Sequence, residues 1–187
     1  MQLTILSGTN RPKSNTLKIA KFSERLLTQK ISKHDEILFL DLQDLPLSLF
    51  SPTSYQEKPK EFEGFVKAIA KSDALLVVVP EYNGGPPGVL KYFIDMLPFP
   101  QSLQKLPSLF IGVAAGRFGG LRPVEQMQEV FRYRNAYLYP ESVYLTGVFE
   151  SLEADGKPKD EATVKLIHQS FDGFLDFARK LSKKPTD

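Results

Sequence analysis

The chain has 187 residues, of which 42% are hydrophobic and 25% charged, and this composition predicts one compact domain with a substantial core. The 24 Lys and Arg residues nearly balance the 22 Asp and Glu residues, and the resulting net charge of +2 disfavours a nucleic-acid-binding protein. Cysteine is absent and only two histidines occur, which excludes disulfides and thiolate chemistry and disfavours an imidazole metal centre.

The first half of the chain alternates short apolar runs with amphipathic segments. The LTIL run at 3–6 predicts a strand that stops at a turn-forming SGTNRP segment, and an apolar stripe over 19–26 predicts a helix after it. ILFL at 37–40 predicts the second strand. The Pro- and Ser-rich stretch 46–59 predicts a long surface loop, and the apolar spacing over 62–69 predicts the next helix.

The second half continues the same alternation. LLVVV at 75–79 is continuously apolar and largely β-branched, which is typical of a strand covered by helices on both faces. The sequence then predicts two more strands, at 108–114 and 142–145, and three more helices, at 89–97, 124–131 and 164–178. The polar tail KKPTD is expected to fray.

Five strands separated by helices predict a doubly wound α/β domain over residues 1–187, in which a five-stranded parallel sheet lies between two helix layers. With the strand order 2-1-3-4-5, ligands bind beyond the carboxyl ends of the strands, between strands 1 and 3. The unusual polar and glycine-rich segments follow strands 1, 3 and 4. We therefore expect all three segments at one rim of the sheet.

The opening residues, MQLTILSGTNR, lack the basic n-region and the longer apolar stretch of a signal peptide. No apolar run approaches the roughly 20 residues that are needed to span a bilayer. We therefore expect a cytoplasmic protein with neither a membrane nor a nucleic acid as partner. His34 and His168 lie in no motif, and we expect both to be solvated.

The segment 7–16, SGTNRPKSNT, directly precedes a helix. Backbone N–H groups at a helix start supply both donors and positive potential to a phosphate. The hydroxyls of Thr9, Ser14 and Thr16 add donors, and Arg11 adds charge-assisted bonds. An ordinary helix cap with a solvated arginine is the alternative. The segment matches neither GxGxxG nor GxxxxGK[ST], which argues against a Rossmann dinucleotide or a nucleoside triphosphate.

Two more segments are rich in residues that permit close approach. PEYNGGPPG at 80–88 combines glycines with prolines that fix the loop, as a flat ring ligand requires, although a rigid strand-to-helix turn is the alternative. AAGRFGG at 114–120 leaves space for the far edge of a ring or for a second substrate. Arg117 is a candidate for a phosphate contact, and a solvated arginine is the alternative.

GTNRPKSNT, PEYNGGPPGVLKYFIDML and AGRFGG occur in the order and spacing of the NADPH-dependent FMN reductases, and residues 1–145 resemble this family. The resemblance implies a flavodoxin-like fold, FMN as cofactor and NADPH or NADH as hydride donor. It also implies a small oxidised acceptor such as a quinone, a flavin, an azo compound or a metal oxyanion. Because the flavin carries the hydride chemistry, no catalytic acid, base, nucleophile or metal is expected.

The family pattern also implies a set of FMN contacts. The phosphate contacts fall on Thr9, Arg11, Ser14 and either Asn15 or Thr16. The isoalloxazine would be lined by Pro80, Glu81, Tyr82, Asn83 and Gly84, and flanked by Ala115, Gly116 and Arg117. We further expect Arg117 to favour NADPH by facing its 2′-phosphate.

The resemblance implies a homodimer or homotetramer with the helix 89–97 at the subunit contact, where Tyr92, Phe93 and Met96 are candidates; core packing is the alternative. An FMN-binding electron carrier without NAD(P)H activity is an alternative function. The slight basic excess disfavours it, because carriers often dock through a strongly charged acidic surface. A flavin-free binding module on the same scaffold is a third interpretation.

Overall fold

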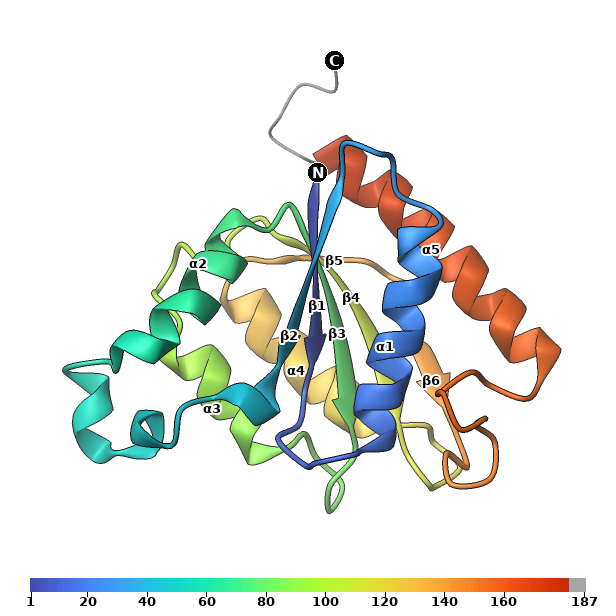
Figure 1. The fold of residues 1–187 in the computed structure, drawn as a ribbon, viewed down its shortest axis with the longest axis horizontal. Helices are drawn as coiled ribbons and strands as arrows, with labels where there is room; N and C mark the ends of the chain where they lie inside the picture. The colour runs from blue at the N-terminus through green and yellow to red at the C-terminus, as the bar shows by residue number, and fades with distance from the viewer. Residues whose placement is uncertain (182–187) are drawn as a thin grey trace.

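A parallel β-sheet lies at the centre of the structure, with helices on both faces (Figure 1). This computed structural model describes residues 1–181. The strands are β1 (Gln2–Ser7), β2 (Glu36–Asp41), β3 (Ala74–Pro80), β4 (Pro107–Val113), β5 (Tyr137–Leu138) and β6 (Val143–Leu145). The α-helices are α1 (Asn15–Thr28), α2 (Glu63–Lys71), α3 (Gly88–Met96), α4 (Leu121–Tyr133) and α5 (Glu161–Leu181). Within residues 1–181, no helix is both long and apolar enough to cross a membrane.

The predicted strand order is confirmed, because the sheet runs β2-β1-β3-β4-β5 with parallel pairing throughout. The prediction of five strands is corrected to six. Outside β4, the edge of the sheet consists of two pieces: β5 pairs with the start of β4, and β6 pairs with its end. Pro140 lies between the two pieces, and its missing N–H and fixed φ interrupt the ladder there.

The core is divided by the sheet into two apolar layers, and β3 contributes to both. All seven residues of β3 are buried. Leu76 and Val78 pack with α1 and α5, whereas Leu75 and Val77 pack with α2, α3 and α4, because successive side chains of a strand point to opposite faces. The prediction of a strand covered on both faces is therefore confirmed.

The segment 46–59 is more ordered than the predicted loop. It contains two short 3₁₀ helices, η2 (Leu47–Phe50) and η3 (Pro52–Tyr55). The hydroxyl of Tyr92 on α3 donates to the carbonyl of the buried Leu49 at 2.7 Å, and this bond anchors the segment to α3. The expected fraying of residues 183–187 lies outside the described residues.

One part of the predicted subunit contact is wrong. Phe93 and Met96 on α3 are fully buried, and both belong to the core layer beneath α3. They point to the sheet because they lie on the apolar face of the helix. Among the three candidate side chains, only Tyr92 is partly exposed, and its ring stacks on Phe50.

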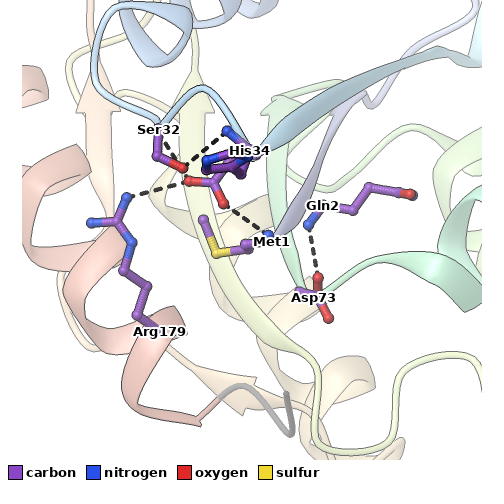
Figure 2. A network of polar contacts seen from close by, with 7 residues as sticks. Met1, Gln2, Ser32, His34, Asp73 and Arg179 are labelled. Carbon is purple, nitrogen blue, oxygen red and sulfur yellow. Dashed lines mark hydrogen bonds and ion pairs between the residues drawn. The ribbon is translucent and has the colours of Figure 1, made fainter. Parts of the chain in front are cut away.

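An ion-pair cluster closes the amino end of the sheet, away from the carboxyl ends of the strands (Figure 2). Asp35, in the turn between α1 and β2, accepts a hydrogen bond from the Met1 ammonium at 2.8 Å. The Ser32 N–H donates to its second oxygen at 3.0 Å, and Arg179 on α5 lies 3.4 Å from the same oxygen. Burial alone would raise the pKa of Asp35, but its bond to the ammonium, its bonds to Ser32 and the ammonium's charge outweigh burial and lower the pKa to about 2.

Candidate functional site

A cavity of about 360 Å³ lies at the carboxyl ends of β1, β3 and β4, where sequence analysis placed the ligand. Four stretches of the chain line it: residues 11–16 at the start of α1, residues 80–82 after β3, residues 113–115 after β4, and residues 148 and 149 after β6. Stretches that are far apart in the sequence therefore form one wall.

The predicted site residues divide into two groups by position. Those in the wall are Arg11, Ser14, Asn15, Thr16, Pro80, Glu81, Tyr82 and Ala115. The others stand outside the wall as its neighbours in the chain or behind it: Thr9, Asn83, Gly84, Gly116 and Arg117. The two histidines are also outside it, with His34 exposed and His168 partly buried on α5.

The start of α1 has the donors that a phosphate requires. Ser14 is the N-cap, and its Oγ accepts a hydrogen bond from the Leu17 N–H at 3.0 Å. The N–H groups of Asn15 and Thr16 have no acceptor among residues 1–181. Such free N–H groups carry the positive end of the helix dipole. The donor set therefore fits the phosphate group of FMN.

The backbone just before the cap has an uncommon conformation. Lys13 has a φ of 54°, in the left-handed region that residues other than glycine seldom adopt. Such a conformation costs on the order of 1 kcal/mol or more, and such outliers concentrate at ligand sites. A left-handed residue next to a helix start also orients successive N–H groups into a concave, anion-binding surface.

The side chains of Asn15 and Thr16 differ in what they contact. Asn15 Nδ2 donates to the carbonyl of Val148 at 3.0 Å, which ties the start of α1 to the segment after β6. Thr16 is only 2% exposed, and its hydroxyl has no protein partner within residues 1–181. The Thr16 hydroxyl is thus free to contact a ligand in the cavity, whereas the Asn15 amide already has an acceptor.

Thr9 connects two parts of the site. Its Oγ1 lies 2.8 Å from Tyr82 Oη and accepts a hydrogen bond from the Arg11 N–H at 3.2 Å. With an exposed fraction of 1%, Thr9 lies behind the wall, where it holds Tyr82 and the backbone of Arg11 in place. The predicted hydroxyl is present, and its partners are protein groups.

Asn83 and Gly84 form the tip of a tight turn. Their φ angles are 52° and 80°, and Tyr82 and Gly85 exchange backbone hydrogen bonds at 2.9 and 3.1 Å. Positive φ at both central positions defines a type I′ turn, for which Asn-Gly is the preferred pair. The turn keeps Asn83 and Gly84 out of the wall, which the preceding residues of the loop line.

Helix α4 fixes the loop after β3 at two points. Arg122 Nη1 donates to Glu81 Oε1 at 2.8 Å, and Gln126 Nε2 donates to the Gly84 carbonyl at 3.2 Å. The Glu81 side chain is 14% exposed, so its charge is partly withdrawn from water and partly balanced by Arg122. Arg122 could not be predicted from the sequence, because no spacing rule relates position 122 to position 81.

Two positions near the site require glycine, because another segment of backbone approaches each of them closely. A Cβ on Gly8 would lie 2.6 Å from the Val78 carbonyl oxygen, to which the Gly8 N–H donates. A Cβ on Gly112 in β4 would lie 2.5 Å from the Gly119 carbonyl oxygen. The segments after β1 and β4 therefore fold tightly against the sheet.

One side of the wall was not predicted from the sequence. Val148 and Phe149 line the cavity, with exposed fractions of 5% and 76%. Their position after β6 places them at the carboxyl edge of the sheet, like the other wall segments. No local pattern marks them, because two apolar residues in a loop give no periodicity.

Comparison with known proteins assigns this chain to a family. The family model of the NADPH-dependent FMN reductases matches residues 1–150, which include every segment of the cavity wall. This chain belongs to the NADPH-dependent FMN reductase family. FMN as cofactor, NAD(P)H as hydride donor and an oxidoreductase activity, all predicted from the sequence, are thereby confirmed.

Individual relatives of this reductase cover most of its length. An NAD(P)H-dependent FMN reductase of Pseudomonas aeruginosa is 27% identical over 173 residues, which are 90% of this chain and 94% of the relative. A quinone reductase of Pseudomonas putida is 30% identical over 165 residues, 85% of each chain. Among solved structures, the flavoenzyme NAD(P)H:(acceptor) oxidoreductase FerB of Paracoccus denitrificans has a TM-score of 0.80 at 26% identity, covering 97% of this chain and 98% of FerB.

Proposed function

We propose that this reductase, as a single FMN-binding domain over residues 1–187, holds FMN in the 360 Å³ cavity and passes hydride from NAD(P)H to a small oxidised acceptor. The acceptor class is a quinone, a flavin, an azo compound or a metal oxyanion. The observation that carries this proposal is the meeting of the α1 start with the segments after β3 and β4 in one wall.

The phosphate end of the proposed site is the start of α1. The N–H groups of Asn15 and Thr16 donate to the phosphate, and the Thr16 hydroxyl adds a further donor. Arg11, which is exposed at the wall, adds a charge-assisted bond. Ser14 contributes by capping the helix, and Thr9 contributes by holding Tyr82, because the hydroxyls of both are already engaged with protein groups.

The ring end of the proposed site is formed by Pro80, Glu81, Tyr82 and Ala115. Asn83, Gly84, Gly116 and Arg117 border the mouth, where the nicotinamide and the acceptor enter in turn. When bound, FMN supplies the hydride chemistry. The residues of this chain bind and orient the reactants and exclude water, and none is required as an acid or a base.

Purified protein tests the proposal. We expect a yellow protein that releases FMN on denaturation and is bleached by NAD(P)H under anaerobic conditions, with colour restored by a quinone. A protein that binds no FMN overturns the proposal. A protein that holds FMN but is not bleached by either nucleotide is instead an electron carrier.

We also propose a homodimer or homotetramer that uses α3 and the adjacent end of α4. The support is an exposed aromatic pair beside α3: Phe99 and Tyr133 stack with ring centroids 6.0 Å apart, and they are 58% and 75% exposed. Light scattering at several protein concentrations tests this, and we expect Tyr133→Arg to lower the measured mass. The cytoplasm is the proposed location, since the reaction draws on NAD(P)H.

A further inference from the structure

Two arginines gather on one aromatic ring beside the cavity. The guanidinium carbon of Arg117 lies 4.9 Å from the centroid of Phe118, and that of Arg122 lies 4.7 Å from it. Both distances fall within the range of cation–π attraction. Phe118 is 42% exposed, so the two guanidinium groups that contact its ring lie at the protein surface, where ligands can reach them.

The two charges are not equally compensated. Arg122 pairs with Glu81 at 2.8 Å. Among residues 1–181, no carboxylate lies within ion-pair distance of Arg117. The cluster of Arg117, Phe118 and Arg122 therefore carries a net positive charge, and clustered like charges are stabilised by a bound anion.

This cluster borders the proposed FMN cavity. Ala115 lines the cavity two positions before Arg117, and Glu81 lines it while holding Arg122. The loop is also fixed from behind, because Gly119 has a φ of 58° and a Cβ there would lie 2.8 Å from the Tyr144 carbonyl carbon. Arg117 is thus held on a tightly packed loop, two positions from the lining residue Ala115.

None of the three cluster residues lines the cavity, whose proposed phosphate end is formed by residues 11–16. Arg122 belongs to α4, and α4 packs on the opposite face of the sheet from α1 (Figure 1). Because Arg117 lies outside the cavity lining, we assign its anion to a molecule other than the cofactor. The hydride donor is such a molecule, and NADPH differs from NADH only by a 2′-phosphate.

We propose that Arg117 binds the 2′-phosphate of NADPH, and that Phe118 and Arg122 position its guanidinium. The planar guanidinium of arginine suits a phosphate because two N–H groups donate in parallel. This inference rests on the proposed function, in which the nicotinamide of the same nucleotide enters the FMN cavity. It assigns NADPH, rather than NADH, as the preferred donor.

Binding of two fragments to the FMN-loaded protein tests the assignment without turnover. Calorimetric titration with adenosine 2′,5′-bisphosphate and with adenosine 5′-monophosphate separates the 2′-phosphate from the rest of the nucleotide. We expect Arg117→Ala to weaken the binding of the bisphosphate about tenfold and to leave the affinity for the monophosphate within about twofold of wild type. Arg117→Lys keeps the charge but loses the two parallel N–H donors of the guanidinium. Its affinity for the bisphosphate is expected to lie between those of wild type and Arg117→Ala.

Steady-state kinetics give the matching readout. For Arg117→Ala, kcat/KM with NADPH should fall about tenfold through KM, whereas kcat/KM with NADH should stay within about twofold. Phe118→Ala should also lower the ratio of kcat/KM with NADPH to kcat/KM with NADH, because the ring positions Arg117. A loss of folding alone would lower both values equally and leave the ratio unchanged. Arg132→Ala is the matched control, because Arg132 is an exposed arginine on the same helix as Arg122 that does not line the cavity.

The outcomes separate the two proposals. Equal losses with NADPH and NADH in Arg117→Ala, or no change with either, overturn the 2′-phosphate assignment while an active wild-type protein upholds the proposed function. Wild-type protein that binds no FMN or oxidises neither nucleotide overturns the proposed function, and the assignment falls with it.

Discussion

The hydroxyl oxygen of Thr9 lies 2.8 Å from the phenolic oxygen of Tyr82, although 73 positions separate the two residues in the chain. Thr9 follows β1 and Tyr82 follows β3, so the contact crosses the gap between the first and third strands, where the strand order reverses. Tyr82 lines the cavity and Thr9 is buried behind it. One hydrogen bond therefore couples the loop of the proposed phosphate end to the loop of the proposed ring end.

We expect Thr9→Val to destabilise the apo-protein by about 1–3 kcal/mol, because it leaves the Arg11 N–H without an acceptor and Tyr82 without a partner. Tyr82→Phe removes the same contact from the other side. In urea titrations of the two single variants and the double variant, the destabilisation should be less than additive. Thr9→Ser, which keeps the hydroxyl, is the control, and additive losses would show that the contact contributes nothing.

Ser14 allows the helix cap to be separated from the phosphate site. Ser14→Ala should cost the apo-protein about 1 kcal/mol, because the Leu17 N–H loses its acceptor. Ser14→Asp keeps a capping oxygen but brings a negative charge to the proposed phosphate end. Its apo-protein should therefore be as stable as wild type in urea, whereas its FMN affinity, measured by fluorescence quenching, should fall at least tenfold. Unchanged FMN affinity would refute the assignment of the phosphate to the start of α1.

Arg11 is exposed in the wall, and its expected role is in binding alone. Arg11→Ala should lower the affinity for FMN about tenfold through loss of a charge-assisted bond, and the melting temperature of the apo-protein should not change. Because the contact is electrostatic, wild-type affinity should also fall as salt rises, and less so in the variant. Retention of FMN equal to wild type at every salt concentration would refute the assignment of Arg11.

The sequence predicted which segments would meet at the rim, but not how each would be arranged there. A Gly-rich segment after a buried parallel strand must lie at the carboxyl edge, and topology alone brings such edges together. The exclusion of Asn83 from the wall follows instead from positive φ at two successive residues. Asn-Gly signals that turn type, yet its orientation depends on α4, which holds Gly84 through Gln126. That contact crosses 42 positions, and no local pattern predicts it.

Gly112 provides a test of the tight packing after β4. Gly112→Ala should destabilise the protein by about 1–3 kcal/mol, because the new methyl group would lie 2.5 Å from the Gly119 carbonyl oxygen and the loop would have to shift. Gly116→Ala in the same loop is a matched control, since a Cβ there meets nothing within 4 Å. Equal stability of the two variants in urea would mean that the loop is not packed as described.

Asp35 should make the stability of the fold depend on pH. Its pKa in the folded state, about 2, lies below the ordinary value of 3.8, so folding favours the carboxylate. This contribution is complete above about pH 4 and is lost as the pH falls toward 2, and it amounts to ~2 kcal/mol. Between pH 5 and pH 2, wild type should therefore lose more stability than Asp35→Asn in urea titrations. Asp172→Asn, at an exposed ion pair, should follow wild type.

The edge of the sheet was only partly predictable from the sequence. SVYL predicted one final strand, and Val143 and Leu145 are indeed buried in it. The short β5 before it was missed, because Tyr137 is exposed and Leu138 is only partly buried, so two residues give no periodicity. Phe149 was missed for a related reason: an exposed aromatic side chain in a loop has no pattern, and its function depends on which residues it faces.

The bond between the Asn15 amide and the Val148 carbonyl has a consequence for how this reductase can change over evolution. It makes the outer wall beside Phe149 an extension of the first turn of α1. Backbone shifts in the segment after β6 that reshape the entrance for a new acceptor will also pull on the turn that is proposed to bind the cofactor. Because the acceptor is the backbone carbonyl of residue 148, any side chain there can keep the bond, whereas replacing Asn15 releases the segment, so position 15 is the one whose exchange should loosen the entrance and the first turn of α1 together.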